Sequence, residues 1–174
     1  MYLEISPRRT GKTTRFVKAV KEWIKDENNV ALIFCHQRSW ARELGRQIGA
    51  RNRNSVQFIF GEKQFNDYLI GCCRSERQRV FVDEFDFMDW YPVDVEGYYV
   101  TTPKRQRTMG EMISFLLGEN EDRFLQLIRF NNGHYEQYSP MQWLNQMNLS
   151  QIKDLRHMYQ REHFNMEMLA NAFK

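Results

Sequence analysis

Apolar residues occur along this chain in two patterns, short continuous runs and stripes with helical spacing. The run at residues 30–35, Val-Ala-Leu-Ile-Phe-Cys, is typical of a strand that is covered on both faces of a parallel sheet. Such runs alternate with segments in which apolar residues recur every three or four positions, as they do in an amphipathic helix. The clearest helical stripe consists of Phe16, Val17, Val20, Trp23 and Ile24. This alternation predicts an α/β fold with a mostly parallel central sheet and helices on both of its faces.

The same patterns give the expected positions of the elements. Strands are predicted at residues 2–5, 30–35, 56–60, 79–84 and 97–103. Helices are predicted at residues 12–26, 39–49 and 63–70, with one helical turn at 86–90. After residue 103 we expect a helix at 108–117, a strand at 124–130, a turn at 132–133 and helices at 141–147, 151–160 and 162–172. No linker-like stretch interrupts the sequence, so we predict a single domain over residues 1–174.

The segment between the first strand and the first helix has the composition of a phosphate-binding loop. Residues 7–14 are Pro-Arg-Arg-Thr-Gly-Lys-Thr-Thr. They match the pattern G-x-x-x-x-G-K-[ST] except at its first position, where Ser6 replaces the glycine. Such a loop binds polyphosphate through its backbone N–H groups and the dipole of the following helix. Lys12 would then reach the β- and γ-phosphates, and the Thr13 hydroxyl would bind Mg²⁺. The predicted nucleotide-binding residues are Arg9, Thr10, Gly11, Lys12, Thr13 and Thr14. The alternative is an ordinary helix N-terminus that follows a glycine.

Two carboxylates end the apolar run at residues 79–84, Arg-Val-Phe-Val-Asp-Glu. In a nucleotide-hydrolysing site, an aspartate at the carboxyl end of a strand holds Mg²⁺. A glutamate next to it can orient and deprotonate the attacking water. We therefore predict Asp83 as a metal ligand and Glu84 as the general base, with a surface or capping pair of carboxylates as the alternative.

A third motif, Thr101-Thr102-Pro103, ends the next predicted strand. Hydroxyls at the end of a strand beside the carboxylate strand can bond the γ-phosphate or the attacking water. Thr102 is therefore predicted to sense the γ-phosphate, and the alternative is a simple Thr-Thr-Pro turn.

Together these motifs resemble the ATPase domain of viral large terminases, the DNA-packaging motors of tailed phages and herpesviruses, which are P-loop NTPases of the ASCE type. Arg8 stands at the position of the arginine in the family's loop, and 83–84 and 101–103 match its Walker B and coupling motifs. Residues 164–173 are similar to a Phe-x-x-Glu-hydrophobic run near the end of that domain. The resemblance implies an ATPase with ATP and Mg²⁺ as ligands and with Arg8 as an arginine finger in the same subunit.

Two departures from the family modify this expectation. The nuclease domain of the large terminases has no counterpart in these residues, and only five residues precede Ser6, where the family carries a segment that contacts adenine. We therefore expect a stand-alone, reduced motor domain for which nuclease activity is not implied, and we leave its base preference open.

Composition removes several other classes. With 42% apolar and 14% aromatic residues the chain is not a disordered one, and no apolar run approaches the roughly 18–20 residues that span a bilayer. The three cysteines and four histidines lack the spacing of a zinc site. Without a recognisable secretory signal we expect a reduced, cytoplasmic protein, in the host cytoplasm if it is viral.

The net charge of +3 is modest, but the basic residues are clustered. The three basic groups are Arg8, Arg9, Lys12, Arg15, Lys18 and Lys21; Arg74, Arg77 and Arg79; and Lys104, Arg105 and Arg107. They could contact DNA or a packaging complex, or they could form an ordinary solvated surface. Arg9 competes with Arg8 as the finger. Alternatively, a neighbouring subunit supplies Arg105, Arg107 or Arg123, which would require a homo-oligomer for activity.

Three functional classes follow from these observations. The first is a motor-type ATPase that acts on DNA or on a packaging complex. The second is a nucleoside kinase similar to type II thymidine kinases, although the zinc-binding cysteines usual in those enzymes are absent here. The third is a nucleotide-binding regulator with low turnover that acts on a larger motor.

Overall fold

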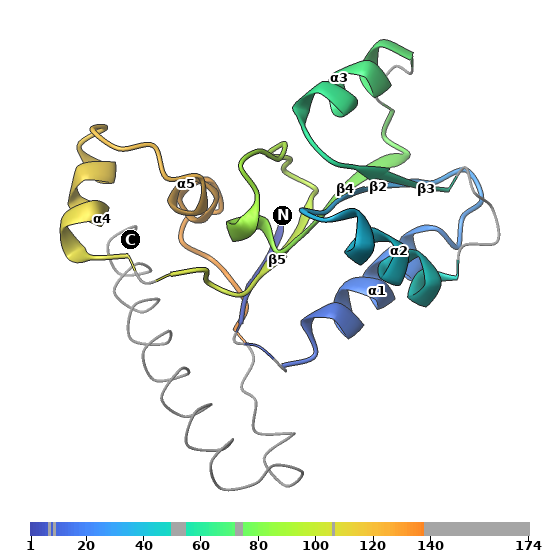
Figure 1. Ribbon diagram of the computed structural model, residues 1–174, viewed down its shortest axis with the longest axis horizontal. Coiled ribbons are helices and arrows are strands. Elements are labelled where there is room, and N and C mark those ends of the chain that lie inside the picture. The colour runs from blue at the N-terminus through green and yellow to red at the C-terminus, as the bar shows by residue number, and fades with distance from the viewer. Residues whose placement is uncertain (7, 9, 50–54, 72–74, 106, 138–174) are drawn as a thin grey trace, which may run out of the picture. The chain divides into compact units, whose positions relative to one another are not determined.

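A computed structural model gives the fold, and it describes residues 1–6, 8, 10–49, 55–71, 75–105 and 107–137 (Figure 1). The helices predicted at 141–147, 151–160 and 162–172 lie outside the described residues, as do the similar run at 164–173 and Arg9. The predictions on those segments therefore stay predictions.

A five-stranded parallel sheet is the centre of the fold, as the alternating pattern predicted. Its strands are β1 (Tyr2–Ile5), β2 (Val30–Phe34), β3 (Val56–Ile59), β4 (Gln78–Asp83) and β5 (Tyr98–Thr101). The strand order is β1-β5-β4-β2-β3. In the register of the central strands, Phe34 pairs with Val82 and Asp83 pairs with Val100. The strand that ends in Thr101 is thus the direct neighbour of the strand that ends in Asp83.

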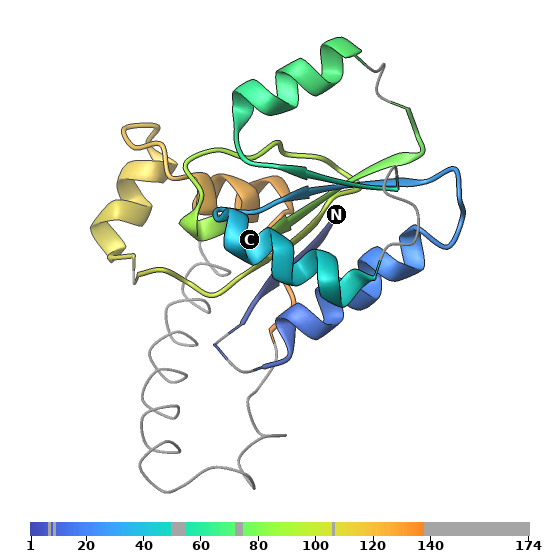
Figure 2. The same cartoon turned by 45° about the vertical axis from the view of Figure 1, so that its right-hand side comes forward.

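Three helices cover the part of the sheet formed by β2, β3 and β4. They are α1 (Lys12–Trp23), α2 (Arg38–Ile48) and α3 (Glu62–Gly71). Helices α1 and α2 lie on one face of these strands and α3 lies on the other, which agrees with the expected helices on both faces (Figures 1 and 2). Helix α1 ends at Trp23 rather than at the predicted residue 26, and the Asn29 side-chain amide donates to the Trp23 carbonyl at 3.0 Å.

The pleat of the strands separates two apolar layers. Ala31, Ile33 and Cys35 from β2 and its end join Phe81 in the core against α1 and α2. On the opposite face, the Phe34 ring contacts Phe65 of α3 at a centroid distance of 5.4 Å. Because side chains alternate along a strand, Asp83 shares the α1 and α2 face with Phe81. The sequence at 78–83 therefore aims its terminal carboxylate at the side where α1 and α2 begin.

The segment between β4 and β5 is held by the buried Tyr99. The Tyr99 hydroxyl donates to the Pro92 carbonyl at 2.9 Å and accepts from the Asp94 N–H at 2.7 Å. Its ring lies against Gly97, where a Cβ atom would stand 2.3 Å from Tyr99 Cε2. The expected helical turn at 86–90 is instead a short 3-10 helix, η1 (Phe85–Phe87).

The chain divides into two compact units. The first comprises residues 1–2 and 11–100, and the second comprises residues 3–10 and those from 101 onward. The second unit contains α4 (Met109–Leu116) and α5 (Arg123–Phe130). Helix α4 agrees with the predicted 108–117 and starts with a capping box, in which Thr108 and Glu111 satisfy each other's backbone N–H groups.

Helix α5 corrects the strand predicted at 124–130. The apolar residues Phe124, Leu125, Leu127 and Ile128 are all buried, and their pairwise spacing is that of one helix face rather than of alternation. Asp122 caps the helix by accepting from the Phe124 and Leu125 N–H groups at 2.9 and 3.2 Å. The apolar positions were interpreted as the alternation of a strand, but their spacing and the cap favour a helix. The turn predicted at 132–133 is confirmed by positive φ at both residues.

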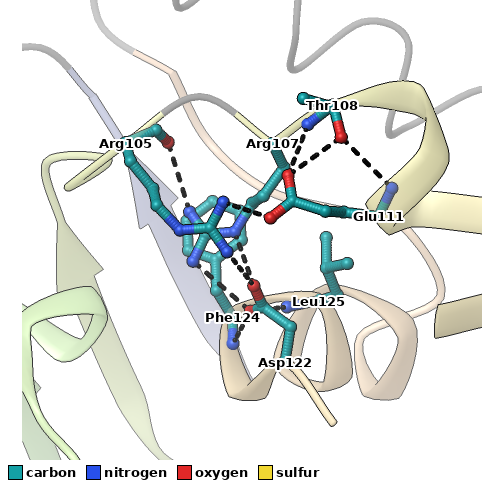
Figure 3. A network of polar contacts seen from close by, with 7 residues as sticks. All are labelled: Arg105, Arg107, Thr108, Glu111, Asp122, Phe124 and Leu125. Carbon is teal, nitrogen blue, oxygen red and sulfur yellow. Dashed lines mark hydrogen bonds and ion pairs between the residues drawn. The ribbon is translucent and has the colours of Figure 1, made fainter. Parts of the chain in front are cut away.

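A buried ion pair ties the chain after β5 to the start of α5 (Figure 3). Arg107 Nε and Nη2 donate to the two carboxylate oxygens of Asp122 at 2.9 and 3.3 Å, and the guanidinium lies over the Phe124 ring at 3.9 Å. Arg105, which is half exposed, pairs with Glu111 at 2.6 Å and lies 3.6 Å from Asp122. The Arg107 guanidinium is therefore committed within its own unit.

The contact between Gly97 and Tyr99 predicts a strong effect of one added methyl group. We expect Gly97→Ala to lower the free energy of unfolding by about 1–3 kcal/mol, because the ring is fully buried and cannot move aside. Gly45→Ala in helix α2 is the matched control, because the added Cβ would meet only the Phe58 ring of β3, at an ordinary contact distance of 3.5 Å. That variant should gain up to about 1 kcal/mol from helix propensity. Urea denaturation followed by circular dichroism measures both, and equal effects of the two substitutions would contradict the packing described at Gly97.

Candidate active site

Lys12 is the first residue of α1 and is almost fully buried, at 7% exposure. The preceding Gly11 has φ of 81°, a left-handed conformation that glycine adopts without steric cost. Gly11 has no side chain to cap the helix, and the first turn of α1 carries no acidic residue. The positive end of the α1 dipole is therefore not countered by a carboxylate of its own turn.

Asp83 ends β4 and is 1% exposed. Its carboxylate accepts hydrogen bonds from the indole N–H of Trp40 and from the backbone N–H of Glu84. Burial raises the pKa of Asp83 from 3.8 to about 7, and the charge of Glu84 adds to the rise. The Trp40 hydrogen bond and the positive charge of Lys12 lower that pKa in turn. The structure thus brings Lys12 and Asp83, which are far apart in the sequence, to the same place in the first unit.

The contact of Trp40 with Asp83 was not predicted from the sequence. Its ring is half buried against the core, but its polar atom is bonded to the candidate metal ligand. The sequence held a usable signal, because Trp40 is in the first turn of α2 and α2 follows β2 directly. A tryptophan there lies at the carboxyl ends of the strands, and a buried indole N–H needs an acceptor.

Glu84 follows Asp83 with φ of 54° and ψ of 50°. A residue other than glycine in this left-handed region costs about 1–2 kcal/mol, and such residues gather at functional sites. The conformation ends β4 and starts η1, and it leaves the Glu84 side chain half buried beside the buried carboxylate.

The chain leaves β2 and β4 toward opposite faces of the sheet. After β2 it enters α2, which lies with α1, whereas after β4 it reaches Trp90, whose ring contacts Phe34 and Phe65 on the α3 side. Such a point in a parallel sheet is where α/β proteins bind their ligands, outside the carboxyl ends of the strands. Asp83 stands at this point.

Cys35 follows the end of β2 and is 1% exposed. Burial raises the pKa of its thiol to about 12, and the nearby Asp83 adds to that rise. The thiol is therefore protonated at neutral pH, and Cys35 is a packing residue rather than a nucleophile.

The remaining predicted site residues fall in both units. Thr13 and Thr14 are in the first turn of α1, half buried and exposed respectively. Arg8, Thr10 and Thr102 belong to the second unit, where Arg8 is exposed and the two threonines are buried. The Thr102 carbonyl accepts from the Thr101 hydroxyl at 3.1 Å. Their predicted roles stay predictions.

The structure also places two of the basic groups. Arg79 lies near the amino end of β4, opposite to Asp83, where it donates to the Glu96 carbonyl at 2.7 Å and lies over the Trp23 ring. The Arg77 carbonyl accepts from the Val30 N–H at the same edge of the sheet. These arginines are therefore not near the carboxylates. In the third group, Arg107 is buried in the ion pair with Asp122, which does not suit a finger for a neighbouring subunit.

No protein-family model, curated protein or solved structure matches this chain in the three comparisons. Within the described ranges, no three His, Cys, Asp or Glu side chains are grouped to hold a metal ion. None of the helices in those ranges is long and apolar enough to cross a membrane.

The raised pKa of Asp83 predicts that this carboxylate destabilises the ligand-free fold at neutral pH. The folded chain holds the proton up to about pH 7 and the unfolded chain only to about 3.8, so stability falls as the pH rises between these values. We expect Asp83→Asn to be more stable than the parent at pH 8 by up to about 4 kcal/mol, and the gain should shrink toward pH 4.

Thermal and urea unfolding in EDTA at several pH values measure this difference. The exposed Asp67 on α3 supplies the control, since Asp67→Asn should change stability by less than about 0.5 kcal/mol at every pH. An Asp83→Asn variant that is less stable than the parent at pH 8 would be incompatible with a carboxylate strained by burial.

Proposed function

We propose that this chain is a Mg²⁺-dependent ATPase of the P-loop type, a motor-type domain similar to that of the viral large terminases. The observation that supports the proposal most is the approach of a buried lysine at a helix N-terminus to a buried aspartate at a strand end. Buried charged groups are costly unless they are paired or used, and perturbed carboxylates gather at functional sites.

In this proposal the groups of the first unit divide the work. Lys12 and the first N–H groups of α1 bind the β- and γ-phosphates, and the α1 dipole favours their negative charge. Glu84 takes the proton of the attacking water as the general base. Arg8 stabilises the charge on the transferring phosphoryl group and Thr102 senses the γ-phosphate, two roles that come from the resemblance.

The donor set suits magnesium. Thr13 offers a hydroxyl and Asp83 a carboxylate, and Mg²⁺ prefers hard oxygen ligands, usually one or two from the protein beside phosphates and water. When bound, Mg²⁺ neutralises charge that develops on the phosphates. The Trp40 N–H and Lys12 lower the pKa of Asp83 against the effect of its burial, and a bound Mg²⁺ would favour the ionised carboxylate further. Because phosphates and water would supply the other ligands, this Mg²⁺ site would not require three or more His, Cys, Asp or Glu side chains.

The proposed partner is DNA or a packaging complex, and this part of the proposal also comes from the terminase resemblance. Lys18 and Lys21 on α1 are exposed, whereas Arg79 and Arg107 are engaged in contacts within the chain. Exposed lysines on α1 are therefore the first candidates for phosphate contacts, which would weaken steeply with salt. Assembly into a homo-oligomer on this partner belongs to the same proposal.

The proposal predicts that binding and hydrolysis separate in two variants. Glu84→Gln should bind ATP with Mg²⁺ as the parent does but hydrolyse it at least about 10²-fold more slowly, because the base is lost. Lys12→Ala should lose binding itself, because the phosphates lose their cation. Single-turnover hydrolysis and equilibrium binding of labelled ATP measure the two steps, with and without double-stranded DNA.

The outcomes separate the three functional classes. Hydrolysis that DNA stimulates supports the motor class, phosphate transfer to an added nucleoside indicates a kinase, and tight binding without phosphate release indicates a regulator. Full hydrolysis by Glu84→Gln would falsify the assignment of the base, and full binding by Lys12→Ala would remove the site itself.

A further inference from the structure

Trp40 connects helix α2 to the candidate metal ligand. We infer that Trp40 is a positioning residue, whose indole N–H fixes the Asp83 carboxylate in the orientation that binds Mg²⁺ with the nucleotide. The inference rests on the proposed function, because it assigns to Trp40 a role toward the metal that Asp83 would hold.

The hydrogen bond leaves the carboxylate with two unlike oxygens. Trp40 Nε1 donates to Asp83 Oδ2. The indole is a donor only, so it occupies a lone pair of this oxygen and cannot accept a hydrogen bond from the carboxyl group. One oxygen of Asp83 is thereby assigned to the protein. The carboxylate presents its remaining bonding capacity in a fixed direction.

The donor itself is held firmly. Trp40 lies in α2 and packs against the core that α1 and α2 cover. Leu44, one turn later on the same helix, is fully buried. A tryptophan has two side-chain torsions, both restricted by this packing, so its N–H has little freedom to leave the carboxylate. At 1% exposure, Asp83 has little access to water that could replace the lost donor.

A polar partner of this kind is the usual second layer around a metal ligand. Ligating carboxylates are themselves hydrogen-bonded, and loss of such a partner typically lowers metal affinity about 10–100-fold. Without the indole N–H, the Asp83 carboxylate keeps the hydrogen bond from the Glu84 backbone N–H but loses the donor that α2 supplies, so metal binding has to order it further. We therefore expect Trp40→Phe, which keeps an aromatic ring, to weaken Mg²⁺ binding while it leaves metal-free nucleotide binding intact.

Trp23 provides a matched control within the same unit. It is also half buried against the same core, and its Nε1 donates to the Val30 carbonyl at 3.2 Å. Its hydrogen bond lies at the amino end of β2, away from Asp83. Trp23→Phe thus removes an indole and a hydrogen bond of similar burial, but no contact with the candidate metal ligand.

The experiment uses the full chain and the non-hydrolysable triphosphate AMP-PNP. Calorimetric titrations with AMP-PNP in EDTA, and with MgCl₂ in saturating AMP-PNP, give the two affinities separately. We expect the Mg²⁺ affinity of Trp40→Phe to fall about 10–100-fold, with the EDTA titration unchanged and Trp23→Phe equal to the parent in both.

A second readout needs no substitution. In a ¹H–¹⁵N spectrum of the parent, the Trp40 indole signal should move when MgCl₂ is added to the AMP-PNP complex, while the Trp23 signal stays. This measurement decides the question even if Trp40→Phe does not fold.

Each result has one meaning. A parent that does not bind AMP-PNP with Mg²⁺ removes the proposed function and the inference with it. If the parent binds but Trp40→Phe keeps the parent's Mg²⁺ affinity, weakens no more than Trp23→Phe, or binds Mg²⁺ more tightly, the positioning role alone is wrong. A Trp40 indole signal that ignores Mg²⁺ in the bound parent also overturns it.

Discussion

The burial of one carboxylate is the constraint around which the carboxyl end of the central strands is organised. Asp83 is almost inaccessible to solvent, and an ionised carboxylate in such surroundings is strongly disfavoured unless donors and cations compensate. The compensation comes from three separate elements: the α2 indole, the N–H of Glu84 and the cation at the start of α1. The meeting of α1, α2 and β4 is thus tied to the charge of a single side chain.

The buried carboxylate of Asp83 lowers the stability of the fold at neutral pH. Replacing a buried, partly compensated charge by a neutral group is often neutral or favourable for folding, and natural proteins commonly accept such costs where function requires them. The left-handed backbone of Glu84 adds a second local cost directly beside the first. Two unfavourable features thus stand next to each other at the end of a central strand, where packing alone does not account for them.

The fold was largely predictable from the sequence because its signals are local. The continuous apolar run of β2 and the helical stripe of α1 each carry their own period, and parallel pairing follows from their alternation. At α5 the apolar residues of 124–130 were interpreted as alternating, whereas the adjacent pairs 124–125 and 127–128 have the spacing of one helix face. Helix ends were less predictable, since the last carbonyl of α1 accepts from a side chain six residues further on, that of Asn29.

The sequence proposes the candidate site as a set of residues whose roles stay predictions, and it says less about how they are arranged. The motifs identified Lys12 and Asp83 because phosphate and metal binding demand those residue types at strand and helix ends. The hydrogen bond of Trp40 was hidden, because hydropathy patterns treat an indole as an apolar ring and ignore its N–H. The raised pKa of Asp83 depends on the depth of burial, a property of the packed structure rather than of its neighbours in the chain.

The ion pair between Arg107 and Asp122 has a mechanical consequence for the second unit. It clamps the chain a few residues beyond Thr102 onto the first turn of α5, and the Phe124 ring backs the guanidinium. Helix α4 lies between Arg107 and Asp122 in the sequence, so the ion pair closes the stretch that contains α4 into a loop within the second unit.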